Sequence, residues 1–325
     1  MIEKKTDSKK SVSDYQYLIV GGTTKAATTS LFSYLAAHPT ICAASFKETR
    51  FFLDSDYPLP SKFRFKGDVE EYNQLFTDCE ENQIRLESTP DYLYCSSALE
   101  RIAAFLPNAK LVFSLREPIS RLVSWYRFAV QIGRLPKSLN FDDYAEDLLT
   151  DTKQDKVFKD TNPSDFPQYM QALQQGCYSE YLKRYYDIIG EQRIYTLFFE
   201  ELAENPLNVL NDICHFAGIH PDFYSDYIFK VTNRTETMRN SGLHNRYTTF
   251  RFKVRKWTHN KPIIHKPLRA MRKAIEPLYL SLNTRTEEAV SISDKTQSKL
   301  IAYFKPDVEI LSELIGKKPP WRPFE

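Results

Sequence analysis

Several features that are common in proteins of this size are scarce or absent in this sequence. The 325 residues include only nine glycines, well under the usual share of about 7%. The apolar runs have the length of a strand and fall far short of the roughly 18 apolar residues that a membrane-spanning helix needs. With 42% hydrophobic and 14% aromatic residues, the composition excludes disordered and fibrous proteins and predicts a soluble globular chain.

Cysteine is also scarce. The five cysteines are odd in number and widely spaced, with no Cys-x-x-Cys pair and no neighbouring histidine cluster. The start of the chain is charged and lacks the apolar core of a signal peptide, so we expect residues 1–14 to be a disordered leader and 15–325 to form a single domain. These features together predict reduced structural thiols in a cytoplasmic protein. The cysteines are Cys42, Cys79, Cys95, Cys177 and Cys214.

Apolar runs of strand length alternate with helical patterns along the chain. Such an alternation predicts an α/β fold with a central, mainly parallel sheet flanked by helices. The predicted strands are 17–20, 84–87, 110–115 and 193–198. The predicted helices are 98–105, 119–131, 180–189 and 207–216, a final helix is expected at 293–315, and the polar stretch 149–167 is expected to be an exposed insertion.

The first predicted strand leads through Gly21 and Gly22 into small and hydroxyl residues, and a helical pattern follows. A strand, a tight turn and a helix start bring unpaired N–H groups to one point, which is a ready site for an anion. An ordinary turn with a Thr or Ser helix cap is the alternative. An ATP-binding P-loop requires Gly-Lys-Ser/Thr without interruption, whereas Lys25 lies three residues before Thr28.

A second candidate anion site follows the strand 110–115. Arg116 comes directly after this strand, and Ser124 lies eight residues further, inside the predicted helix. The planar, permanently charged guanidinium group suits a phosphate dianion. The alternative is that Arg116 forms a surface ion pair with Glu117.

These motifs together resemble those of sulfotransferases that use 3′-phosphoadenosine 5′-phosphosulfate (PAPS). Residues 22–31 resemble the 5′-phosphosulfate loop, with Ala27 where that loop usually has glycine, and Arg116 with Ser124 resembles the 3′-phosphate motif. Residues 46–52 and 87–92 resemble segments of heparan-sulfate-type and bacterial carbohydrate sulfotransferases. The resemblance covers most of residues 17–218 and implies a P-loop-like three-layer fold.

The resemblance also implies roles for individual residues. Glu48 would be the base that activates the acceptor, and Lys25 would stabilise the leaving group. PAPS would be the sulfate donor, and no metal is implied. The acceptor would be a carbohydrate or a small natural product, sulfated on a hydroxyl group or, as the second choice, on an amine. Arg50 stands where heparan-type enzymes have histidine, so Asp91 and Glu87 remain candidates either for supporting the base or for replacing it. The implied cofactor-binding residues are Lys25, Ala26, Ala27, Thr28, Thr29, Ser30, Arg116, Ser124, Tyr178 and Arg239.

The near-neutral total charge of +2 hides a basic segment at 230–273. This segment has thirteen Lys and Arg and one acid, giving +12, so the rest of the chain carries −10. Four interpretations of this segment remain open: a solvated surface, a flap over the nucleotide, a site for an anionic glycan, or contact with an anionic membrane. Binding of nucleic acid is disfavoured, because no recognised nucleic-acid-binding module accompanies the segment. The competing functions are a P-loop kinase or NTPase and a non-catalytic nucleotide-binding or membrane-surface protein. The sequence does not predict an oligomeric state.

Overall fold

The computed structural model describes residues 11–57, 59, 61, 63–150, 171–229, 237–238, 284–285 and 290–324. Of the predicted insertion 149–167, only the first two residues are described. Of the basic segment, only residues 237–238 are described, so the predicted nucleotide contact of Arg239 lies outside the described residues.

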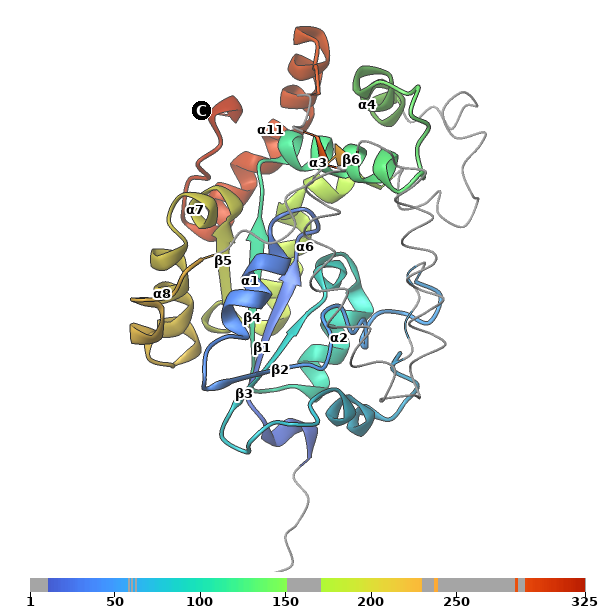
Figure 1. Ribbon diagram of the computed structural model, residues 1–325. Coiled ribbons are helices and arrows are strands. Elements are labelled where there is room, and N and C mark those ends of the chain that lie inside the picture. The colour runs from blue at the N-terminus through green and yellow to red at the C-terminus, as the bar shows by residue number, and fades with distance from the viewer. Residues whose placement is uncertain are drawn as a thin grey trace, which may run out of the picture.

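A five-stranded parallel sheet forms the centre of the molecule, as the sequence predicts (Figure 1). The strand order is β2-β3-β1-β4-β5, so β1 is central, with β3 and β2 on one side and β4 and β5 on the other. Ligands bind to such sheets outside the carboxyl ends of the strands, where the strand order reverses. The strands are β1 (Tyr17–Gly22), β2 (Ile41–Ala43), β3 (Ile84–Ser88), β4 (Ala109–Leu115) and β5 (Ile194–Phe198), with a separate antiparallel pair β6 (Thr237–Met238) and β7 (Thr284–Arg285).

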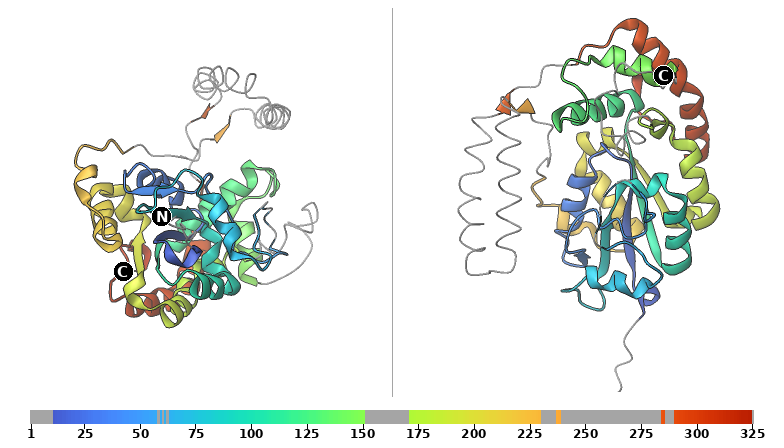
Figure 2. Two further views of the ribbon diagram at one scale, coloured as in Figure 1. Left: turned by 90° about the horizontal axis from the view of Figure 1, so that it is seen from below. Right: turned by 90° about the vertical axis from the view of Figure 1, so that its right-hand side faces the viewer.

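Helices cover both faces of the sheet and form the outer layers (Figures 1 and 2). In β1, Tyr17 and Ile19 pack with α2, α6 and part of α11, whereas Leu18 and Val20 pack with α1 and α8. Every residue of β1 is buried, as expected for a parallel strand covered on both faces. The α-helices are α1 (Thr28–Leu35), α2 (Ser96–Phe105), α3 (Pro118–Gln131), α4 (Phe141–Thr150), α6 (Tyr178–Ile189), α7 (Phe199–Glu204), α8 (Pro206–Ala217) and α11 (Asp294–Ile315).

The end of the predicted leader is ordered. The 3-10 helix η1 (Val12–Asp14) packs against η2 (Val69–Leu75), and its Val12 is completely buried. The Ser11 hydroxyl donates a hydrogen bond to the Glu70 carboxylate at 2.7 Å. Residues 11–14 therefore belong to the folded body, and the predicted boundary of the leader at residue 14 is too late.

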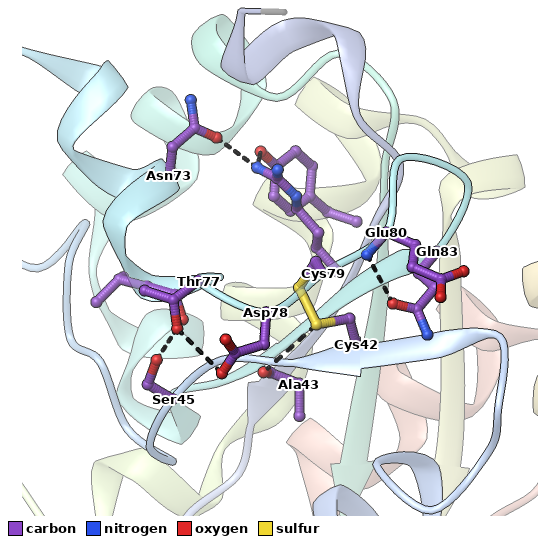
Figure 3. Close-up of a disulfide and its surroundings, with 12 residues drawn as sticks. Cys42, Ala43, Ser45, Asn73, Thr77, Asp78, Cys79, Glu80 and Gln83 are labelled. Carbon is purple, nitrogen blue, oxygen red and sulfur yellow. Dashed lines mark hydrogen bonds between the residues drawn. A yellow bond between two sulfur atoms is a disulfide. The ribbon is translucent and has the colours of Figure 1, made fainter.

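Two of the five cysteines form a disulfide, so the prediction of five reduced thiols is wrong for this pair. Cys42 in the edge strand β2 is bonded to Cys79, which lies 37 residues away in the segment after η2 (Figure 3). The backbone N–H of Ser45 also donates to the Leu75 carbonyl at 2.8 Å, so the same two segments are joined twice. The other three cysteines are free thiols, as predicted.

We expect the double substitution Cys42→Ser with Cys79→Ser to lower the free energy of unfolding by roughly 2–4 kcal/mol, because the bond constrains a loop of this length in the unfolded chain. Urea unfolding followed by circular dichroism measures the change. Dithiothreitol should lower the midpoint of the wild-type protein and leave that of the double variant unchanged. Equal midpoints for wild type and variant under oxidising conditions would contradict the expectation.

Candidate functional site

The loop between β1 and α1 has the backbone geometry of an anion-binding turn. Lys25 and Ala27 have φ angles of 70° and 57°, in the left-handed region where glycine is usually favoured. Ala27 is the N-cap of α1, and no side chain caps the helix from this position. The alternative of an ordinary turn capped by Thr or Ser is therefore wrong. The N–H groups of the first helical turn, which begins at Thr28, have no partner within the helix.

Hydrogen bonds from β4 fix this loop. The backbone N–H of Thr23 donates to the Ser114 carbonyl at 2.6 Å, and the Ser114 hydroxyl donates to the Ala26 carbonyl at 2.7 Å. Arg116 Nη1 donates to the Lys25 carbonyl at 3.1 Å. The structure thus brings together the two predicted phosphate motifs, which lie 91 residues apart in the sequence.

Arg116 has no ionic partner among the described residues. Glu117 does not pair with it, because its carboxylate accepts hydrogen bonds from the N–H groups of Ile119 and Ser120 and so caps α3. The guanidinium group of Arg116 lies over the Phe199 ring at 4.4 Å, and its buried Nε has no hydrogen-bond partner in the described part of the chain. Burial lowers the pKa of Arg116, so an anion bound beside it would supply a missing counter-charge.

A pocket of about 280 Å³ opens beside Arg116. Two arginines and two serines are among the described residues that line this pocket, and no acidic residue is. Such a lining favours an anion. The lining residues are Arg116, Ile119, Ser120, Val123, Ser124, Arg127 and Ile292.

Tyr178, a predicted nucleotide contact, lies behind the pocket. Its side chain is fully buried, and its hydroxyl donates to the Arg116 carbonyl at 2.7 Å. Glu200 gives further support, because its carboxylate accepts from the Glu117 N–H and from Trp321 Nε1, both at 3.0 Å. These residues hold the end of β4 in place and do not line the pocket.

Glu48 lies between two cations on a loop that follows β2. Lys47 Nζ contacts Glu48 Oε1 at 3.0 Å, and Arg50 Nη2 contacts Oε2 at 2.7 Å. Burial acts to raise the pKa of Glu48, but the two cations outweigh it and the pKa is lowered. The carboxylate is therefore ionised across the neutral range, and its side chain keeps 36% of its surface exposed.

The two alternative bases lie close to Glu48 and are more deeply buried. Glu87 is completely inaccessible and Asp91 is 7% exposed. Burial raises the pKa of Glu87 to about 7 and that of Asp91 to about 6, with the charge of Glu48 adding to the shift of Asp91. Because Glu87 has no exposed surface, it cannot contact an acceptor directly.

Glu87 instead holds the loop that carries Glu48. Its Oε1 accepts hydrogen bonds from the hydroxyls of Thr49 and Thr89, at 2.9 and 2.6 Å. The Thr89 hydroxyl in turn accepts from the N–H of Arg50 at 3.0 Å. Glu48 and Arg50 both have positive φ angles, so this buried network fixes an unusual backbone conformation on both sides of Thr49.

The residues around Arg116 and those around Glu48 and Glu87 follow the carboxyl ends of neighbouring parallel strands. Arg116 follows β4, the loop of residues 23–27 follows β1, and the Glu87 network lies at the end of β3. A hydrogen bond between the Thr23 and Tyr94 hydroxyls joins the loop to η3 (Pro90–Tyr94). The arrangement places the pocket beside Arg116 and the partly exposed Glu48 carboxylate at the same edge of the sheet.

The sequence interpretation missed two residues of this site. Ser120 and Arg127 line the pocket together with Ser124 but were not predicted to belong to it. Their spacing of four and then three residues places all three on one face of α3. This periodicity is visible in the sequence and could have identified them.

Comparison with known proteins gives the family. A family model described as the sulfotransferase domain matches residues 16–266. The chain belongs to the sulfotransferase family. It is 28% identical over 223 residues to a bifunctional heparan sulfate N-deacetylase/N-sulfotransferase 1 of Caenorhabditis briggsae, a match that covers 66% of this chain and 24% of the relative.

Two further proteins extend the comparison of this sulfotransferase. The membrane-associated sulfotransferase kil1 of Dictyostelium discoideum is 35% identical over 131 residues, covering 40% of this chain and 26% of kil1. The chain thus spans about a quarter of the length of either curated relative. A crystal structure of a sulfotransferase from Alicyclobacillus acidocaldarius has the same fold, with a TM-score of 0.61, 22% identity and coverage of 94% of this chain and 97% of that one.

These findings correct the predicted cytoplasmic location, which is wrong. One relative is named as membrane-associated, and the disulfide between Cys42 and Cys79 is a feature of proteins from oxidising compartments. Within the ranges that the structure describes, no helix has the length and apolar character needed to cross a membrane.

Proposed function

We propose that this sulfotransferase transfers the sulfuryl group of PAPS to an acceptor. The observation that carries the proposal is the half-buried Arg116. It has no ionic partner in the described part of the chain, lines the pocket and donates a hydrogen bond to the loop between β1 and α1. The pocket fits the 3′-phosphate, because its described lining includes arginine and serine side chains and no acidic residue. The start of α1 fits the 5′-phosphate, because its first-turn N–H groups have no side-chain cap.

Each part of the site then has a role. The backbone of residues 25–27, with Thr28, Thr29 and Ser30, would hold the 5′-phosphate, and Arg116 with Ser124 would hold the 3′-phosphate. The Lys25 ammonium would stabilise negative charge on the oxygen that bridges sulfur and phosphorus as their bond breaks. Glu48 would take the proton of the acceptor as its oxygen or nitrogen bonds to sulfur.

Two observations support an acceptor class, namely the name of a relative and the cations beside Glu48. The C. briggsae relative is named for N-sulfation of heparan sulfate, a carbohydrate. Lys47 and Arg50 flank the proposed base and would also suit an anionic acceptor. We therefore propose a hydroxyl or amine of a carbohydrate, with a small natural product as the second candidate. Measuring turnover of labelled PAPS over glycans, phenols, sterols and guanidinium-bearing compounds would identify it.

We expect adenosine 3′,5′-bisphosphate (PAP), the product nucleotide, to raise the melting temperature of the protein by several degrees at 100 times its Kd, because binding at this excess contributes about 2.7 kcal/mol. Arg116→Ala should remove the effect. Thermal shift with PAP, and in parallel with ATP and magnesium, is the measurement. Stabilisation by ATP with magnesium and none by millimolar PAP would favour an NTPase and overturn the proposal.

A further inference from the structure

The loop that carries Glu48 is bound to the end of β3 by buried hydrogen bonds. The backbone N–H of Glu48 donates to the Ser88 carbonyl at 2.9 Å. The hydroxyls of Thr49 and Thr89 both donate to Oε1 of Glu87, whereas its buried Oε2 has no hydrogen-bond partner in the described part of the chain. The network therefore uses Glu87 through a single accepting oxygen, which the carbonyl of a carboxamide could also supply.

A second buried side chain, that of Arg64, holds the same loop from a later segment of the chain. Arg64 is 7% exposed. Its Nη1 donates to the Arg50 carbonyl at 3.1 Å, and its Nη2 donates to the carbonyls of Tyr57 and Leu59. The N–H of Arg50 donates to the Thr89 hydroxyl at 3.0 Å. Both the N–H and the C=O of Arg50 are thus fixed by buried side chains from different segments.

Two left-handed residues make the position of the Glu48 carboxylate depend on these contacts. The φ angles of Glu48 and Arg50 are 62° and 57°, values that residues other than glycine retain only where the surrounding structure fixes them. A change of φ at either residue would redirect its side chain, and the two side chains now meet at 2.7 Å between Arg50 Nη2 and Glu48 Oε2. A loop released from Glu87 or Arg64 would therefore lose the present position of the carboxylate.

Resting on the proposed role of Glu48 as the base, we propose that Glu87 and Arg64 are positioning residues for sulfuryl transfer. They act through the loop and hold the Glu48 carboxylate where it can take the proton of the acceptor. A displacement of about 1 Å at a reacting group costs about 10²-fold in rate. The loop of residues 23–27 is held separately, by Ser114 of β4, so the loss of either side chain should lower kcat and leave the binding of PAPS unchanged.

Turnover of labelled PAPS, with desulfated and N-deacetylated heparin as the acceptor, measures this effect. This glycan offers both hydroxyl and amine groups. We expect Glu87→Ala and Arg64→Ala to lower kcat about 10²-fold and to leave KM for PAPS within about twofold of wild type. Glu87→Gln should keep kcat within about threefold of wild type, because its carbonyl can accept both hydroxyl hydrogen bonds.

A second measurement does not depend on the acceptor. Carbon-13 NMR of protein labelled in its glutamate carboxyl groups gives the pKa of Glu48, whose resonance is assigned from its absence in Glu48→Gln. The charged groups that face Glu48 are Lys47, Arg50 and Asp91. Displacement from the two cations should raise the lowered pKa of Glu48 in both alanine variants, and the glutamine variant should retain it. Absence of wild-type turnover on this glycan would count against the proposed acceptor class, and the NMR measurement would then decide the inference.

Arg85→Ala is the matched control, because it removes another buried arginine, which donates to the Tyr17 hydroxyl and lies over the Tyr15 ring. Its kcat should equal that of wild type even where its melting temperature falls. A wild-type kcat and an unchanged Glu48 pKa in both alanine variants would overturn the inference while the proposed function stands. Wild-type turnover in Glu48→Gln would instead overturn the proposed role of the base. Should the alanine variants not fold, Thr89→Val removes the link to the loop at nearly constant volume and gives the same comparison.

Discussion

Replacing Lys25 with alanine is expected to lower kcat for sulfuryl transfer by about 10²- to 10³-fold, the usual cost of removing one group that stabilises developing charge. The backbone need not change, because the hydrogen bond from Arg116 ends on the carbonyl of Lys25 and not on its side chain. The Nζ atom lies 4.6 Å from the centre of the Phe128 ring, which positions the ammonium between the loop and α3. Single-turnover kinetics with labelled PAPS would separate kcat from nucleotide binding.

The control for this loss is Lys66→Ala, which removes the same charge from an exposed position on another segment and should leave kcat unchanged. Lys25→Arg should recover part of the rate, because it keeps the charge but changes its position. A Lys25→Ala enzyme with a wild-type kcat and a raised KM for PAPS would show that the lysine only binds the nucleotide.

Local patterns predicted most of the fold. The bounds of β3, β4, β5, α3 and α8 lie within one residue of those expected, because parallel strands and the helices that cover them have apolar patterns that can be read without long-range information. β2 was missed, since three residues are too few to show a period. α4 was also missed, although its four buried residues follow helical spacing.

Two other features that were not predicted depend on contacts between distant segments. The disulfide joins residues 37 apart, and only the pairing of β2 with β3 and the return of the chain through η2 bring them together. Likewise, nothing near Glu87 in the sequence shows that it accepts a hydrogen bond from Thr49. Ala27, by contrast, could be identified from the local sequence, because it stands where the family's loop usually has glycine. The backbone of Ala27 is left-handed, a conformation that glycine adopts without steric cost.

The last prediction concerns which carboxylate accepts the proton. We expect Glu48→Gln to lower kcat/KM about 10²- to 10⁴-fold at neutral pH, because the amide cannot act as a base. A base must be deprotonated, so activity falls as the pH drops through its pKa. Lys47 and Arg50 hold the pKa of Glu48 below the ordinary value of a glutamate, so the acid limb of the wild-type profile should lie lower than that of an unperturbed carboxylate.

Asp91 is the matched comparison, because its pKa is raised to about 6 by burial and by the charge of Glu48. An acid limb near pH 6 that disappears in Asp91→Asn, together with wild-type turnover in Glu48→Gln, would transfer the role of base to Asp91. A limb well below that expected for Asp91 and retained in Asp91→Asn would identify Glu48, which is also the more accessible of the two, with 36% of its side chain exposed. The pKa of Glu48 is lowered from its ordinary value and that of Asp91 is raised. The pH at which activity falls therefore distinguishes the two carboxylates.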